Sequence, residues 1–83
     1  MKNGNSEEER IVARGLRSPG PLLIVKKRLK TLDIRRLRVI VSSREAAEDV
    51  IGYLETRGAV IELDRAGEDY HVIADLAQFK DLE

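Results

Sequence analysis

Apolar residues recur along this chain at two different spacings, and each spacing predicts one type of element. A stripe with steps of three and four residues consists of Leu22, Val25, Leu29 and Leu32. It predicts a helix over residues 19–32, because such steps place side chains on one face of a helix. A second stripe of this kind consists of Ala46, Ala47, Val50, Ile51 and Leu54. It predicts a helix over residues 43–57.

Four strands are predicted around these helices. They cover residues 8–13, 35–41, 59–63 and 70–74. The second strand alternates between apolar and mostly basic positions, and a turn over residues 64–68 returns the fourth strand antiparallel to the third. The predicted order is β-α-β-α-β-β. A small mixed four-stranded sheet with two helices on one face would bury both stripes, so we expect an α+β two-layer sandwich.

Residues with strong positional preferences mark the expected helix ends. Ser18 is predicted to be the N-cap of the first helix, with Pro19 at the first helical position. The stretch from Ser42 to Glu45 has the Ser-x-x-Glu spacing of a capping box and is predicted to start the second helix. Gly58 is placed to close that helix in a left-handed conformation.

We expect a single domain over residues 9–76, with a flexible polar tail over residues 1–8 and a C-terminal tail over residues 77–83. Within the last stretch, Leu76, Phe79 and Leu82 have the spacing of a short helix. The first ten residues are polar and acidic, unlike a signal peptide, and no apolar run approaches the ~20 residues that span a bilayer. These observations predict a cytoplasmic protein that enters no membrane.

Composition and charge limit the chemistry. The 83 residues include no cysteine and one histidine, so we expect no disulfide, no metal site and no other cofactor. The net charge is zero, but residues 10–44 carry eleven basic side chains and one acidic one, whereas residues 45–83 carry eleven acidic and three basic ones. This asymmetry fits a basic face for an acidic partner or a nucleic acid, and equally fits charges that cancel after packing.

The stretch Arg14-Gly15-Leu16-Arg17-Ser18-Pro19-Gly20-Pro21 opens the first predicted helix. Backbone N–H groups at a helix start have no partner within the helix, and the helix dipole places roughly half a positive unit charge there. A side chain at position 18 therefore lies where a protein stabilises a negative group, such as a thiolate or a bound anion.

These residues resemble the signature of the TusA (SirA-like) sulfur-carrier family, Arg-Gly-Leu-x-Cys-Pro-x-Pro, and the resemblance spans about residues 11–74. Seven of the eight positions are filled compatibly, by Arg14, Gly15, Leu16, Arg17, Pro19, Gly20 and Pro21. Ser18 stands where the family has the cysteine that carries sulfur as a persulfide. Val12 stands where the family usually has an acidic residue.

The resemblance implies a sulfur carrier that acts between a cysteine desulfurase, or another upstream carrier, and an acceptor protein. Acceptors of such relays belong to tRNA modification, molybdenum-cofactor assembly or sulfur oxidation. The residues expected to bind a partner are Arg14, Arg17, Lys26, Lys27 and Lys30. Direct nucleic-acid binding by this basic helix face lacks a nearby aromatic side chain on which bases could stack.

Ser18 cannot perform the cysteine's chemistry, because a hydroxyl ionises far above neutral pH and its oxygen holds no transferable persulfide. Two interpretations stay open. Ser18 replaces a natural cysteine in an ordinary carrier, or the serine is native in a domain that has lost sulfur transfer and binds partners through its basic helix face. A hydrolase that uses Ser18 with His71 is disfavoured, because the sequence offers no clear acid to orient the histidine.

Overall fold

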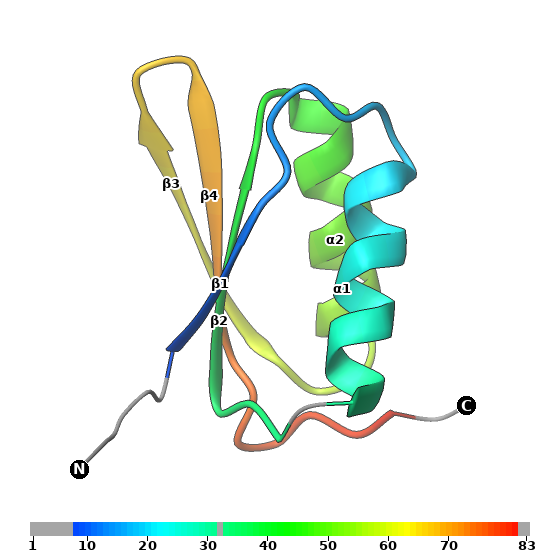
Figure 1. Ribbon diagram of the computed structural model, residues 1–83. Coiled ribbons are helices and arrows are strands. Elements are labelled where there is room, and N and C mark those ends of the chain that lie inside the picture. Colours follow the sequence, from blue (N-terminus) through cyan, green and yellow to red (C-terminus); the bar gives the residue numbers. More distant parts are fainter. Residues whose placement is uncertain (1–7, 32, 82–83) are drawn as a thin grey trace, which may run out of the picture.

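The computed structural model describes residues 8–31 and 33–81. Its elements are β1 (Glu8–Val12), α1 (Gly20–Thr31), β2 (Arg36–Val41), α2 (Arg44–Glu55), β3 (Val60–Ala66) and β4 (Asp69–Asp75). The strands form one sheet in the order β1-β2-β4-β3, in which β1 and β2 are parallel and the other pairs antiparallel. Both helices lie on one face of this sheet (Figure 1). The predicted α+β two-layer sandwich is therefore confirmed.

The hydrophobic core lies between the sheet and the helices. Its fully buried side chains come from both layers and include Val25, Leu37, Val39, Val41, Val50 and Leu54. Leu22 and Leu29 are partly buried and pack against this core, as the stripe on the first helix predicts. Aliphatic side chains supply nearly all of this buried surface, so burial of Leu, Ile and Val is the main source of stability.

The first helix begins one residue later than predicted, and its start differs in detail. The carbonyl of Pro19 accepts a hydrogen bond from the N–H of Leu23 (3.1 Å), so Pro19 precedes the first helical residue, Gly20. The Ser18–Pro19 peptide bond is cis. The Ser18 hydroxyl donates to the carboxylate of Asp49 instead of accepting from the helix. The prediction of Ser18 as N-cap is therefore wrong, because a carboxylate on α2 takes its hydroxyl.

The capping box predicted from Ser42 is also wrong, by one residue. The N-cap of α2 is Ser43, whose side chain accepts a hydrogen bond from the N–H of Ala46 (3.1 Å). The Ser42 hydroxyl instead accepts from the N–H of Gly15 in the preceding connection (2.8 Å). Gly58, after α2, has a φ of +101°, in agreement with its predicted place at the end of that helix.

The third strand is longer than predicted. The expected turn over residues 64–68 is confirmed in place but is shorter than predicted, because β3 continues to Ala66, which pairs with Asp69 in β4. The turn consists of Gly67 and Glu68, and Gly67 has a φ of +65°. A glycine with positive φ permits such a two-residue turn, so the polar residues before it can remain in the strand.

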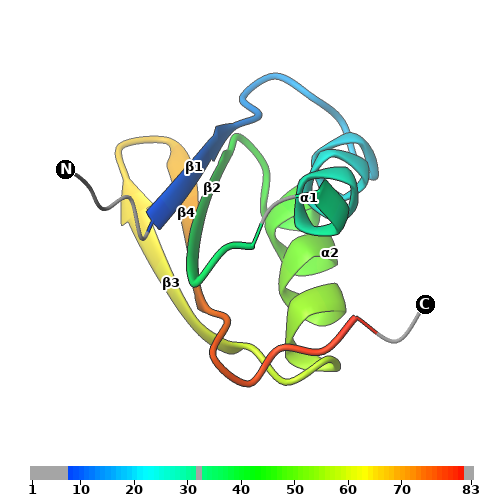
Figure 2. The same cartoon turned by 60° about the horizontal axis from the view of Figure 1, so that its bottom comes forward.

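The segment after β4 returns to the helices without forming one. Residues 77–81, predicted as a tail, are irregular, so the helix suggested by the spacing of Leu76 and Phe79 is wrong. The Phe79 ring nevertheless lies 6.3 Å from the Tyr53 ring of α2, measured between ring centroids. The N–H of Lys80 donates to the backbone carbonyl that follows α2 at position 57 (2.9 Å). The segment therefore packs across the C-terminal end of α2 (Figure 2).

Several predictions concern residues outside the described part of the chain. Of the expected flexible tail over residues 1–8, only Glu8 is described, and it is the first residue of β1. Leu32 and Leu82, which complete two of the apolar patterns, lie outside as well. The two described helices have 12 residues each, and neither combines the length and apolar character needed to cross a bilayer.

Candidate functional site

The predicted motif forms the connection from β1 to α1. Because β1 and β2 are parallel, this connection leaves the sheet at the same edge as the connection from β2 to α2, and both run along the top of Figure 1. Gly15 has a φ of +80°, a conformation that favours glycine. Its N–H donates to the Ser42 hydroxyl (2.8 Å), so the two connections are joined by a hydrogen bond.

Ser18 lies on this connection and contacts α2. Its hydroxyl donates a hydrogen bond to the carboxylate of Asp49, and both residues are partly buried. Hydrogen bonds to a carboxylate are stronger than those between neutral groups. This bond therefore fixes the orientation of the side chain at position 18 and ties the start of α1 to the second turn of α2.

Two opposing electrostatic influences act at position 18. The N-terminal end of α1, which begins two residues later, favours a negative group. The Asp49 carboxylate disfavours one, because like charges repel at hydrogen-bond distance. A neutral hydroxyl that donates to the carboxylate avoids this repulsion. For a thiol at position 18, the helix start would lower the pKa and the carboxylate would raise it.

Sequence reasoning missed both Asp49 and Ser42 as parts of the site. Asp49 lies on the same helical stripe as Ala46 and Tyr53, which are buried. A carboxylate on an apolar stripe is a detectable signal, since such a group needs a polar partner at the helix interface. Ser42 gave no comparable signal, because its partner is a backbone N–H distant in sequence.

The rest of the motif shapes an exposed loop with one buried anchor. Pro21 is fully buried and holds the first turn of α1 against the core. Leu16 is 42% exposed. The carbonyl of Arg17 accepts from the N–H of Gly20 (2.7 Å), which folds the loop tightly into the helix. The motif thus presents an apolar side chain and a basic one at the surface beside position 18.

The predicted basic residues are only partly brought together. Lys27 and Lys30 are both exposed on α1. Lys26 lies closer to α2, with its ammonium 5.2 Å from the centre of the Tyr53 ring. Arg14 forms an ion pair with Asp69 of β4 (2.7 Å), so its guanidinium is held at the sheet and not at the helix layer.

The structure does not bring Ser18 and His71 together. His71 lies on the face of the sheet that the helices leave uncovered, and its Nδ1 is 3.0 Å from a guanidinium nitrogen of Arg38. Ser18 pairs with Asp49 in the helix layer. Among residues 8–31 and 33–81, no group of three or more His, Cys, Asp or Glu side chains is arranged to hold a metal ion.

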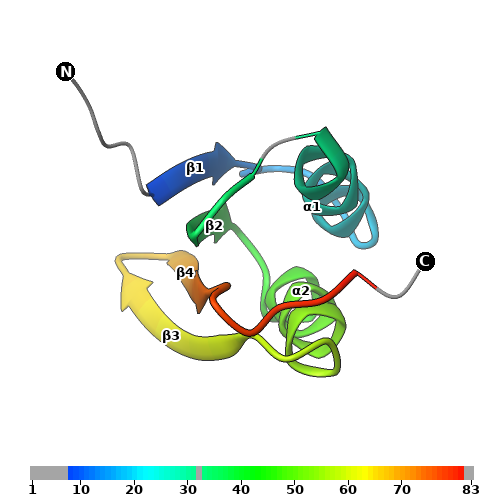
Figure 3. The ribbon, with the colours of Figure 1, turned by 90° about the horizontal axis from the view of Figure 1, so that it is seen from below.

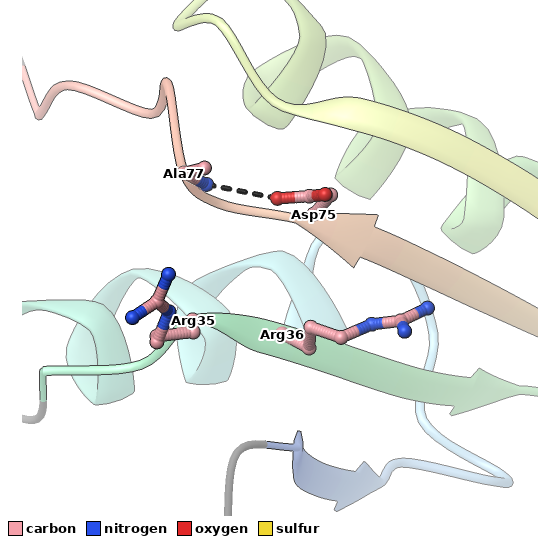
Figure 4. Close-up of a pocket in the computed structure, with 4 residues that line it drawn as sticks. All are labelled: Arg35, Arg36, Asp75 and Ala77. Carbon is pink, nitrogen blue, oxygen red and sulfur yellow. Dashed lines mark hydrogen bonds between the residues drawn. The ribbon is translucent and has the colours of Figure 1, made fainter.

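Two hollows lie at the opposite end of β2 from the motif. The larger, of about 360 Å³, is lined by Arg35, Arg36, Asp75 and Ala77 (Figure 4). The two arginine side chains extend in opposite directions, and the Asp75 carboxylate accepts from the N–H of Ala77 (3.0 Å). These groups do not converge on a common point, so the hollow offers no formed anion site.

Comparisons with known proteins agree with the motif and with the fold. A SirA-like protein from Desulfitobacterium hafniense has a similar structure, with a TM-score of 0.71 and 22% sequence identity over 80% of this chain and 93% of that chain. A comparison with curated protein sequences found no significant match. The family model described as sulfurtransferase TusA matches residues 9–74, which include the motif and position 18. This match covers most of the chain, which therefore belongs to the TusA family of sulfurtransferases.

Proposed function

We propose that this chain is a sulfur-carrier domain that binds the proteins of a persulfide relay and, with Ser18 at the carrier position, does not itself accept sulfur. The observation that carries this proposal is the position of Ser18. It lies on an exposed loop at the start of α1, within an otherwise complete family motif, and its hydroxyl is bonded to Asp49.

The missing step is the covalent one. In sulfur relay, a thiolate attacks the outer sulfur of a donor persulfide, the donor's S–S bond breaks, and the donor departs as a thiolate while a new S–S bond forms on the carrier. This chain contains no cysteine to supply that thiolate. The Ser18 hydroxyl is a neutral hydrogen-bond donor to Asp49 and cannot act in place of the thiolate.

The proposed partner surface surrounds the motif. Leu16 and Leu23 are 42% and 58% exposed, and Lys27 follows one turn after Leu23 on the same face of α1. An apolar pair flanked by cations suits a partner surface with apolar residues and carboxylates. A cysteine desulfurase or an upstream carrier is the donor class that we propose. A cytoplasmic protein of tRNA modification or molybdenum-cofactor assembly is the acceptor class.

The test is to restore the thiol. The Ser18→Cys variant is incubated with a cysteine desulfurase and free cysteine, and its intact mass is measured before and after a reductant. We expect one added sulfur atom that the reductant releases, and no addition to the chain with Ser18. Ser43→Cys is the matched control, because it places a thiol at the start of the other helix. A folded Ser18→Cys variant that gains no more sulfur than this control would contradict the proposal.

A further inference from the structure

One face of the sheet has no cover from any described element (Figure 3). We call it the open face. It carries the side chains of the even-numbered residues of β1, β2 and β3 and of the odd-numbered residues of β4, which alternate with those that point to the helices. It lies on the opposite side of the sheet from α1 and α2, so a protein bound there would leave the motif accessible.

The charges on the open face are divided between its two halves. The basic residues lie on β1 and β2 and are Arg10, Arg36 and Arg38. The acidic residues on the other half lie on β3 and β4 and are Glu62, Asp64, Asp69 and Asp75. Of these, Asp69 forms an ion pair with Arg14. Glu8, on the basic half, forms an ion pair with Arg38 (2.7 Å). Arg10 and Arg36 therefore keep that half positive.

Apolar side chains accompany these charges. Ile40 and Ile73, on the two central strands, are only 3% and 8% exposed. Val12 and Val60, on the two edge strands, are 56% and 66% exposed. Burial of such exposed apolar surface is the general driving force for association. The open face thus combines exposed apolar side chains, whose burial favours association, with charged side chains that favour one orientation of a bound protein.

The strand register makes this face complementary to itself. Arg10, Arg38, Ile73 and Glu62 form one row across the four strands, and Arg36 and Asp75 are neighbours in another. A two-fold axis that runs parallel to the strands, between β2 and β4, places β1 of one copy over β3 of a second copy. Each row of residues then lies over the same row of the second copy. Arg10 then faces the partner's Glu62, and Arg36 faces the partner's Asp75.

We propose that the open face binds a second copy of this chain, face to face, about this two-fold axis. Aligned packing of two sheets is a common arrangement, and isologous contacts are the usual form of a dimer. A two-fold axis perpendicular to the strands would stack β1 on β1 and bring Arg10 near the partner's Arg10. Charge therefore selects the first orientation and opposes the second.

Charge reversal tests this arrangement by analytical ultracentrifugation at low salt. We expect the unaltered chain to form a dimer that added salt weakens. Arg10→Glu and Glu62→Arg each place two like-charge pairs in the dimer, and each raises the dissociation constant by roughly tenfold or more. An equimolar mixture of the two variants regains the dimer, because both cross-pairs are again of opposite charge. Lys27→Glu, on the exposed side of α1, is the control that leaves the dissociation constant unchanged.

Both substituted side chains are exposed, so the variants keep the fold, which circular dichroism checks. If one variant does not fold, Arg36→Glu with Asp75→Arg supplies an independent pair with the same expected pattern. A monomeric unaltered chain at the highest soluble concentration overturns the proposal. Single variants that dimerise as well as the unaltered chain, or a mixture that stays monomeric, also overturn it.

Discussion

Replacement of Gly58 by alanine tests how the last described segment is held against α2. Gly58 has a φ of +101°, and a Cβ placed on it would overlap the carbonyl oxygen of Gln78 and lie 3.2 Å from the carbonyl carbon. Because these are backbone atoms, a side-chain rotation cannot relieve the overlap. We expect the segment after β4 to be displaced from the end of α2.

The magnitude follows from the contacts that this displacement breaks. A non-glycine residue in a left-handed conformation costs about 1–2 kcal/mol. Loss of the hydrogen bond from the Lys80 N–H to the Arg57 carbonyl costs about 1 kcal/mol. Loss of the contact between the Tyr53 and Phe79 rings costs about 0.5–1.5 kcal/mol. Together these predict a loss of about 2.5–4.5 kcal/mol in the free energy of unfolding.

Equilibrium urea denaturation of Gly58→Ala measures this loss, and Gly67→Ala is the matched control. Gly67 also has a positive φ, of +65°, but no atom lies within 4 Å of the added Cβ. We expect Gly67→Ala to lower the free energy of unfolding by about 1–2 kcal/mol, from backbone conformation alone. If the two variants lose equal stability, the packing of Gln78 against the end of α2 contributes nothing and the reasoning is refuted.

Three further predictions follow from contacts of the site and the sheet. In the Ser18→Cys variant, the further change Asp49→Asn removes the negative charge beside the thiol and so lowers the thiol pKa. We expect alkylation of this thiol by iodoacetamide at neutral pH to become faster. A rate that is unchanged or slower would contradict the electrostatic account. The hydrogen bond from Arg38 holds the pKa of Glu8 below its ordinary value. The contact therefore stabilises the fold at pH values above the ordinary glutamate pKa, and this stabilisation is lost as the pH falls through the folded-state pKa. Arg38→Gln should raise the Glu8 pKa in a carboxyl-resolved NMR titration, and an unchanged titration would show that the ion pair is absent in solution. Ser42→Ala removes the acceptor of the Gly15 N–H and should lower the free energy of unfolding by about 0.5–1.5 kcal/mol, measured by urea denaturation. Hydrogen exchange at the Gly15 N–H should become faster. An unchanged exchange rate would argue against this hydrogen bond.

The element order could be predicted because each helix and strand carries its own periodic pattern. The apolar stripe of α2 and the alternation of β2 are local signals, and burial in the core follows them closely. The extent of β3 was underestimated because Asp64 and Arg65 are polar residues of an edge strand, where solvent permits any side chain on the exposed positions. Composition alone therefore made strand residues resemble a turn.

The details of the site could be predicted only as far as they are local. The motif indicated the loop and the start of α1 to within one residue. Ser18 and Ser42 were each assigned to a helix cap, because a nearby N–H is the usual partner of a serine before a helix. Their actual partners, Asp49 and Gly15, are 31 and 27 residues away in sequence. Only the packing of α1 against α2 and the parallel pairing of β1 with β2 bring these groups together.

The parallel pairing of β1 with β2 has a consequence for the order of folding. Ile11 pairs with Val39, so β1 can join the sheet only after the whole crossover through α1 is closed. Closure of such a loop costs conformational entropy before the contacts between the strands form. The antiparallel hairpin of β3 and β4 needs only a two-residue turn and closes locally. We therefore expect β1 to be the last strand to add and the first to open in native-state hydrogen exchange. The motif directly follows β1, so each such opening releases the loop that carries Ser18.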